Sequence, residues 1–164
     1  MQVSFRIHAH LRDDTLKRAR QNRTATGELA LQFGEAWFPS KGWTDFVPDV
    51  LGAMAHALFL LKDEVIEVNT HFMDGPYELY CRRSPTSRAL SLMCVYNDKP
   101  LFARPFHVDR RRYVAELSRT IGDVLLQFRD LGLDQFRDAV FLRKMLNQMT
   151  RQERQRIREG WIGW

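Results

Sequence analysis

The chain has 164 residues, of which 45% are hydrophobic and 27% are charged, a balance that predicts one folded domain over residues 1–164 and excludes a long disordered region. Lysine and arginine exceed aspartate and glutamate by 25 to 20, a net charge of +5 that indicates a nucleic acid or an acidic protein as partner, or serves solubility alone. The longest apolar run, "VLGAMAHALFLL" at 50–61, is too short to span a bilayer and no signal peptide is recognised, so we expect a cytoplasmic protein.

The N-terminal third predicts two strands followed by a helix. "VSFRIHAHLR" at 3–12 alternates apolar and polar residues, which indicates a half-buried strand, and "ELALQF" at 28–33 resumes the alternation after a polar loop. We expect these two strands to pair. "FPSKGWTDFVPDVLG" at 38–52 then opens the first helix, with Asp45 as its N-cap and Pro48 in its first turn.

Residues 65–107 predict four antiparallel strands joined at "MDGP", "SPTS" and "NDKP". Pro76 has no N–H to close a two-residue turn at Asp74 and Gly75, so we expect a wider loop over residues 73–76. The predicted pairs that flank the three turns are Phe72 with Tyr77, Arg83 with Arg88, and Tyr96 with Leu101.

This register divides the side chains of the four strands between two faces. One face is nearly all apolar and is expected to lie against the helices. The other mixes aromatic residues, methionine and charges, the composition of a protein interface. We predict that this second face binds a partner through His71, Glu78, Tyr80, Arg82, Met93, Phe102, Arg104 and Phe106. The alternative is that a terminal helix or the N-terminal hairpin covers it.

Three helices are expected at the C-terminal end. The first runs from an N-cap at Asp109 to a stop at Gly132, and the second from Asp134 to about Gln148 with Phe136, Val140 and Leu146 inward. "TRQE" at 150–153 resembles a capping box that opens a short last helix. The expected fold is therefore α+β, in the order ββαββββααα, with one antiparallel sheet of about six strands and the helices packed on one face.

The sequence carries no glycine-rich phosphate loop, nucleophile elbow or zinc-protease motif, so we expect a protein that is not an enzyme, without catalytic residues, cofactor or metal. His8 and His10 share one strand face, a geometry that metal sites use, but no third ligand is recognisable and exposed polar-face histidines are the favoured interpretation. His71 opposite Glu78 is either the acid–base couple of a small enzyme or an ordinary cross-strand polar pair.

Cys81 and Cys94 match neither a zinc site nor a CxxC redox motif. The predicted register separates them by four strand positions, about 13 Å at roughly 3.3 Å per residue, whereas a disulfide needs Cα atoms within about 7 Å. We therefore expect two free, buried thiols.

Two segments, "FPSKGWTDFVPDVLG" and "FMDGPYELYC", together resemble small bacterial immunity proteins of polymorphic or contact-dependent toxin systems over about residues 33–82. The resemblance implies a non-enzymatic cytoplasmic inhibitor that binds and occludes a cognate toxin domain. Immunity proteins against nucleases are usually acidic, whereas this chain is basic, which implies either a toxin of another kind or one with an acidic binding surface. Interfaces vary between members, so the family assigns no binding residues here.

The arginine-rich C-terminal helices offer a different interpretation, a nucleic-acid-binding module. They include "RRR" at 110–112 together with Arg151, Arg154, Arg156 and Arg158, but no RRM, KH, zinc-finger or helix-turn-helix signature accompanies them. The final "GWIGW" at 160–164 is apolar, and we expect its tryptophans to dock into a groove of this chain, of a partner or of a second copy.

Overall fold

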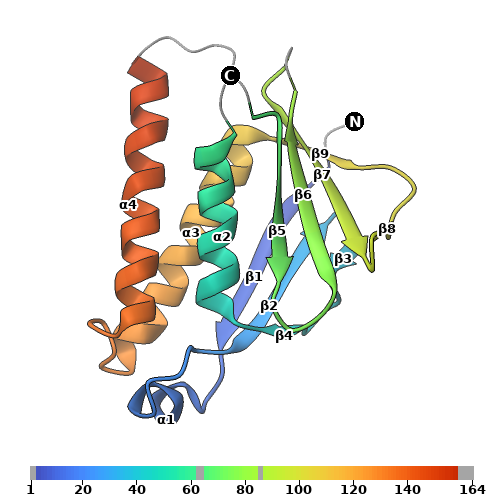
Figure 1. Ribbon diagram of the computed structural model, residues 1–164. Helices are drawn as coiled ribbons and strands as arrows, with labels where there is room; N and C mark the ends of the chain where they lie inside the picture. Colours follow the sequence, from blue (N-terminus) through green and yellow to red (C-terminus); the bar gives the residue numbers. More distant parts are fainter. Residues whose placement is uncertain (1–2, 62–64, 85–86, 159–164) are drawn as a thin grey trace.

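The computed structural model describes residues 3–61, 65–84 and 87–158, which form two antiparallel sheets and four helices (Figure 1). The α+β class is confirmed, but the strands make two sheets instead of one sheet of about six strands. Sheet A contains β1 (Phe5–Leu11), β2 (Gly27–Phe33), β3 (Ala36–Phe38) and β4 (Thr44–Asp45). Sheet B contains β5 (Glu67–Phe72), β6 (Tyr77–Arg83), β7 (Ala89–Tyr96), β8 (Lys99–Pro100) and β9 (Phe106–Asp109). The helices are α1 (Thr15–Arg20), α2 (Val47–Leu60), α3 (Arg110–Asp130) and α4 (Arg137–Arg158).

Sheet A follows the alternation of its sequence. β1 pairs with β2 from Phe5 opposite Phe33 to Leu11 opposite Gly27, so the predicted pairing is confirmed. Phe5, Ile7 and Leu11 are buried, while the intervening polar residues face outward. β3 and β4 both pair with the other edge of β2, which leaves β1 as an edge strand.

Sheet B has the predicted register at its first hairpin only. Phe72 pairs with Tyr77 across the four-residue loop 73–76, as expected from Pro76. The other two predicted pairings are wrong by two residues: Arg83 pairs with Leu90, and Tyr96 pairs with Lys99. Asn97 and Asp98 adopt φ values of +47° and +61°, which these two residue types tolerate, so the third turn closes over two residues instead of four. A shift of two residues leaves each strand's faces unchanged.

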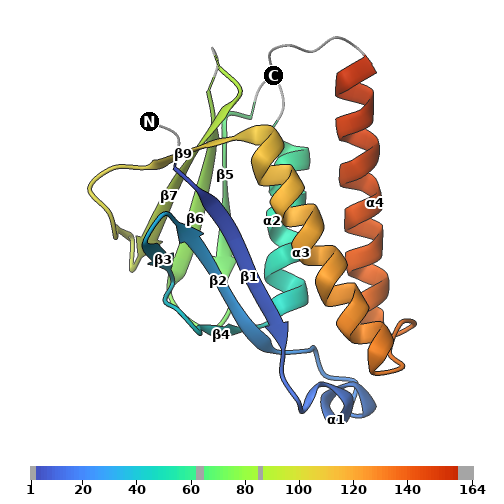
Figure 2. The same cartoon turned by 180° about the vertical axis from the view of Figure 1, so that it is seen from behind.

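The helices pack on the inner sides of the two sheets. α2 lies against β5, and α3 runs along β1 (Figure 2). Where the inner faces of the sheets meet, the ring of Phe33 stacks on Phe106 at 4.3 Å and Phe38 meets Phe72 edge-on at 5.0 Å. α4 packs mainly on α2 and α3, and its first turn also contacts the loop before β2, so it forms the outermost layer.

The two ends of α3 are those that the sequence predicts, whereas α2 starts at a different N-cap and α4 begins at Arg137 and not at Asp134. The carboxylate of Asp109 accepts a hydrogen bond from the Arg112 N–H at 3.1 Å, and Gly132 follows α3 with a φ of +69°. At α2, Pro48 lies in the first turn as expected, but the N-cap residue is Phe46 and not Asp45. Asp45 instead accepts from the N–H of Phe46 at 2.7 Å.

The predicted break between two C-terminal helices is wrong, because α4 is continuous. Thr150 does not cap a new helix; its hydroxyl donates to the Leu146 carbonyl within α4 at 2.8 Å. Val140 was expected inward but is 45% exposed, and the buried apolar residues of α4 are Ala139, Leu142, Met145 and Met149. "GWIGW" lies outside the described residues. Within those residues, the helices lack the length and apolarity needed to cross a membrane.

Candidate functional site

The face of sheet B that points away from the helices is the candidate site (Figure 1). It will be called the outer face of sheet B, and its central residues are Asn69, His71, Glu78, Tyr80, Arg82, Met93 and Val95. The opposite face carries the buried Phe72, Leu79 and Leu92, which belong to the core with the helices. Within the described part of the chain, the helices and the β1–β2 hairpin lie on that inner side and leave the outer face open.

Five residues of the predicted interface lie together on this face, in three rows across the strands. In one row, His71 of β5 is opposite Glu78 of β6. In the next, Tyr80 of β6 is opposite Met93 of β7. Arg82 lies further along β6, opposite Glu67. The agreement follows from the pleat, because a register error of two residues does not change the face of a side chain.

The other three predicted residues do not belong to the outer face. β9 pairs with β7 so that Phe106 is opposite Leu92, which places it on the inner side against Phe33. Phe102 contacts Phe106 with ring centroids 5.0 Å apart and packs against the core. Arg104 is exposed in the irregular segment between β8 and β9. The predicted continuous fourth strand is wrong, because β8 ends after Pro100 and pairing resumes only at Phe106.

Glu78 is the centre of a polar cluster on the outer face. Its Oε2 accepts from the Asn69 side-chain amide at 2.8 Å, and its Oε1 lies 3.8 Å from Nδ1 of His71. The same carboxylate acts on the Tyr80 phenol and raises its pKa. The Glu78 side chain is only 18% exposed and its partners hold it in place, whereas the His71 side chain is 62% exposed.

The Glu78 carboxylate disfavours ionisation of the Tyr80 phenol. The hydrogen bond to Glu78, and then the negative charge of Glu78, raise the pKa of Tyr80 above its ordinary value of 10.0. The phenol therefore remains a hydrogen-bond donor and is not poised as a nucleophile or base at neutral pH. Such a fixed polar group beside an apolar neighbour suits recognition of a partner.

Apolar surface accompanies the polar cluster. Met93 is half-buried directly opposite Tyr80, and Val95 is buried opposite Glu78. Arg82 is exposed at the far side of Tyr80, next to Glu67 across the strand pair. The outer face thus presents the half-buried Tyr80 and Met93 beside the buried Val95, with charged groups around them, a composition typical of a protein interface.

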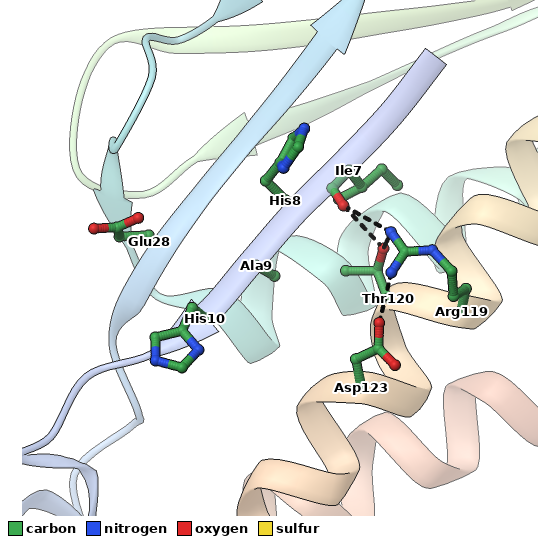
Figure 3. Close-up of a pocket in the computed structure, with 8 residues that line it drawn as sticks. All are labelled: Ile7, His8, Ala9, His10, Glu28, Arg119, Thr120 and Asp123. Atoms are coloured by element: carbon green, nitrogen blue, oxygen red, sulfur yellow. Dashed lines mark hydrogen bonds and ion pairs between the residues drawn. The ribbon is translucent and has the colours of Figure 1, made fainter. Parts of the chain in front are cut away.

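A second feature is a pocket of about 310 Å³ at the free edge of sheet A (Figure 3). Residues from β1, β2 and α3 line it: Ile7, His8, Ala9, His10, Glu28, Arg119, Thr120 and Asp123. His10 lies opposite Glu28 across the strand pair. The pocket therefore brings two imidazoles, two carboxylates and one guanidinium to a single depression, which the sequence did not predict because α3 is more than 100 residues from β1.

The charged groups of α3 beside this pocket complete the edge of β1. Oε1 of Glu116 accepts from the Ile7 N–H at 3.0 Å, while Arg119 donates to the Ile7 carbonyl at 3.1 Å and to Asp123 at 2.6 Å. Further along, the Gln127 side chain accepts from the Leu11 N–H at 2.8 Å. These contacts occupy backbone groups that an edge strand otherwise exposes, so they protect β1 from pairing with another chain.

The protonation of Glu116 reflects this structural role. Burial acts to raise the pKa of its carboxyl, but hydrogen bonds from Arg119 and from the Ile7 N–H, together with the charge of Arg119, outweigh it and lower the pKa. Glu116 is therefore a charged acceptor held between two donors, a role in structure and not in acid–base chemistry.

The two histidines of the pocket have ordinary neighbours. Nε2 of His8 is 2.9 Å from Oε1 of Gln32, and its ring lies 4.7 Å from the Trp37 ring. Among the described residues, no group of three or more His, Cys, Asp and Glu side chains is arranged to hold a metal ion. The contact of His8 with Gln32 could be expected, because strand alternation places both side chains on the same face. The contact of His8 with Trp37 could not, because Trp37 belongs to β3, a strand that the sequence did not predict.

Cys81 and Cys94 are free and buried in the core face of sheet B, as predicted. The predicted separation of four strand positions is wrong, because Leu79 pairs with Cys94 and the two cysteines are therefore only two positions apart. Burial raises the pKa of Cys81 to about 12 and raises that of Cys94 even further. Because the thiolate is the reactive form, both thiols are inert in the folded protein.

No protein-family model, curated protein or solved structure matches this chain. The resemblance to immunity proteins therefore stays a prediction. The two segments that carry it are in contact: the Met73 N–H donates to Asp45 at 3.0 Å, and the rings of Trp43 and Tyr77 meet edge-on at 4.9 Å. They form the junction between the start of α2 and the loop of the β5–β6 hairpin, whose strands carry His71, Glu78 and Tyr80 of the candidate site.

Proposed function

We propose that the protein is a non-enzymatic inhibitor that binds the toxic domain of a bacterial toxin through the outer face of sheet B, as an immunity protein does. The observation that carries this proposal is the open sheet face with Tyr80 and Met93 at its centre and Glu78 held in a hydrogen-bonded cluster beside them. Aromatic residues and methionine are enriched at protein interfaces, so Tyr80 and Met93 on this face support a role in binding a partner. The role places the protein in the cytoplasm of the cell that it protects.

The geometry of His71 and Glu78 favours binding over catalysis. The imidazole is mostly exposed on an open sheet, and its Nδ1 is 3.8 Å from the carboxylate, beyond a hydrogen bond. Catalytic acids and bases act in clefts that exclude water, where electrostatic interactions are strong. A polar pair on an open sheet instead supplies polar contacts at the rim of an interface.

The test uses the gene next to the one that encodes this chain. The C-terminal domain of a large toxin encoded there is produced alone, and binding is measured by calorimetry while protection is scored by co-expression. We expect a stable complex and survival of co-expressing cells. Absence of both binding and protection with every neighbouring toxin domain would overturn the proposal.

A pair of variants locates the interface. Tyr80→Ala with Met93→Ala removes the apolar centre of the outer face of sheet B, and we expect at least a tenfold loss of affinity. Trp37→Ala is the matched control, because Trp37 is also a half-buried aromatic residue but lies beside His8 on sheet A. Equal effects of the two changes would show that the complex forms through another surface.

A further inference from the structure

The outer side of α4 carries a line of positive charge. α4 contains seven arginine and lysine residues but only two acidic residues, Asp138 and Glu153. Both acidic side chains are turned toward the protein: Asp138 is buried and accepts from the Ala25 N–H at 2.8 Å, and Glu153 pairs with Arg110. The solvent side of the helix therefore has cations without interspersed carboxylates.

Four of the cations recur at intervals of seven residues: Arg137, Lys144, Arg151 and Arg158. Seven helical residues rise about 10.5 Å, so the line extends over about 32 Å, and it drifts by only about 20° per interval. The buried residues Leu142, Met145 and Met149 define the opposite side of the helix. Arg143 and Arg154 are exposed on the flank of the same line. These six side chains will be called the α4 basic face.

Nothing in the described chain neutralises most of this face. Arg137 lies 3.4 Å from Asp138, and Arg143 donates to the backbone carbonyl of Asp134. Across the described residues, Lys144, Arg151, Arg154 and Arg158 have no carboxylate within ion-pair distance. Arg151 and Arg154 are three residues apart, and Arg154 and Arg158 four, spacings at which like charges destabilise a helix.

The helix dipole explains only part of the pattern. The dipole favours cations in the last turn of a helix, which accounts for Arg158. Arg137 is the first residue of α4, where the dipole disfavours a positive charge, and Lys144 and Arg151 lie in the middle. α4 is also the outermost layer, so the α4 basic face points away from both sheets (Figures 1 and 2).

We infer that the α4 basic face binds the phosphate backbone of a nucleic acid without reading its sequence. A rigid helix with cations spaced along about 32 Å matches a long, uniform polyanion, since duplex DNA carries one charge per roughly 1.7 Å of axis. Arginine, which supplies five of the six cations, pairs with phosphate through two parallel hydrogen bonds. This function goes beyond the proposed inhibition of a toxin and uses a separate surface.

Two other polyanionic partners fit the face less well. A membrane-bound amphipathic helix inserts its apolar side into the bilayer, but the apolar side of α4 packs on α2 and α3. A protein interface needs a dry apolar centre, whereas the α4 basic face is charged along its whole length and has only Val140 and Phe141 as exposed large apolar neighbours in the described part of α4. Phosphate contacts alone require no such centre.

Fluorescence anisotropy with labelled 20-base-pair DNA and 20-nucleotide RNA of scrambled sequence tests this inference between 50 and 200 mM NaCl. Six phosphate contacts to the duplex give a slope of log affinity against log salt of about −5, a loss of roughly a thousandfold over this range. We expect this steep loss and little difference between sequences. Absence of binding at 50 mM NaCl overturns the inference, as does affinity that is insensitive to salt.

Two variants with the same net charge separate the face from the overall charge. The first combines Arg137→Gln, Lys144→Gln, Arg151→Gln and Arg158→Gln, and we expect at least a tenfold loss of affinity with a slope shallower by 3 to 4. The control combines Arg6→Gln, Arg20→Gln, Lys99→Gln and Arg129→Gln, which are exposed elsewhere, and should stay within about twofold of the wild type. Equal losses in the two variants overturn the inference.

Two additional measurements keep the result specific. Thermal melts show that the first variant is folded. We expect a melting temperature close to that of the wild type, because the reduced like-charge repulsion along α4 offsets the loss of the Arg137–Asp138 pair. Polyglutamate and vesicles of phosphatidylserine are tested as competitors. If either displaces the wild-type protein from DNA at equal or lower charge concentration than unlabelled DNA does, the partner is not a nucleic acid. Toxin binding by the outer face of sheet B is expected to be unchanged in both variants.

Discussion

The backbone N–H of Met73 donates a hydrogen bond to the carboxylate of Asp45, 3.0 Å away and 28 residues earlier in the chain. The same carboxylate accepts from the N–H of Phe46 and from the indole N–H of Trp43. Asp45 is 1% exposed, so all three bonds lie in a protected environment. Asp45 thereby ties the start of α2 to the loop at 73–76, which ends the hairpin of the candidate interface.

Replacing Asp45 with alanine should strongly destabilise the protein. Three donors lose their acceptor, and each buried donor left without a partner costs about 1 to 3 kcal/mol. We expect the free energy of unfolding to fall by about 3 kcal/mol, as measured by urea denaturation. Asp74→Ala, at the exposed tip of the same loop, is the control and should change it by less than about 0.5 kcal/mol. Similar losses from both substitutions would show that Asp45 does not hold this junction.

Gly52 of α2 makes room for the ring of Phe141 on α4. A Cβ at residue 52 would overlap the ring atoms Cε1 and Cζ of Phe141. Gly52→Ala should therefore displace the ring and lower the free energy of unfolding by about 1 kcal/mol, although alanine is the better helix former. In a Phe141→Ala background the overlap is gone, and the same change should stabilise the protein by up to about 1 kcal/mol. A double-mutant cycle of urea melts measures this reversal, and additive effects would contradict it.

The sequence predicted those parts of the fold that depend on residues close together in the chain. The alternation from Phe5 to Leu11, the cap at Asp109 and the stop at Gly132 each follow from a few neighbouring residues. The loop at 73–76 was predictable because Pro76 excludes the tighter turn. The predicted register at the third turn was wrong because it assumed a four-residue loop. Asn97 and Asp98 both adopt the left-handed conformation, which allows a two-residue turn instead.

The division into two sheets depends on contacts that no local pattern encodes. β9 joins β7 after the irregular segment at 101–105, and this change of pairing turns Phe106 from the predicted outer face to the inner side. His71, Glu78 and Tyr80 were placed on the correct face because period-two alternation depends only on register parity. The pocket beside His8 could not be predicted, since Arg119 reaches the Ile7 carbonyl from α3.

Glu153 compensates a buried charge on α3, and its removal should weaken the docking of α4. The guanidinium of Arg110 is almost fully buried and pairs with the Glu153 carboxylate. Glu153→Gln removes the negative partner, and we expect the free energy of unfolding to fall by about 3 kcal/mol, because breaking a buried pair costs about 3 to 5 kcal/mol. Urea denaturation measures the loss.

A second substitution distinguishes charge from packing at this pair. Arg110→Met removes the buried cation and keeps a long apolar side chain, so Arg110→Met with Glu153→Gln should be more stable than Glu153→Gln alone. If the double variant is instead less stable than both single variants, the contribution of Arg110 comes from contacts other than its pair with Glu153.

The two buried thiols should make the protein less stable at alkaline pH. Burial raises the pKa of Cys81 from 9.0 to about 12 and also raises that of Cys94, so both thiols stay protonated when the folded protein is at pH 10. In the unfolded chain they ionise near pH 9. Their contribution is therefore fully present below pH 9 and is lost as the pH rises from 9 toward the folded pKa values. At pH 10 the loss amounts to about 1.4 kcal/mol for each thiol.

Urea denaturation of the wild type and of Cys81→Ala with Cys94→Ala, at pH 8 and pH 10, isolates this effect. Both proteins share every other titrating group, including Tyr113, whose pKa burial also raises. The fall in the free energy of unfolding between the two pH values should be smaller in the alanine variant by about 3 kcal/mol. Ellman's reagent provides the matching readout at pH 8, because it should label neither cysteine in the folded wild type and both in urea. Rapid labelling without denaturant, or identical pH dependence of the two proteins, would mean that the thiols are accessible and ionise in the folded state.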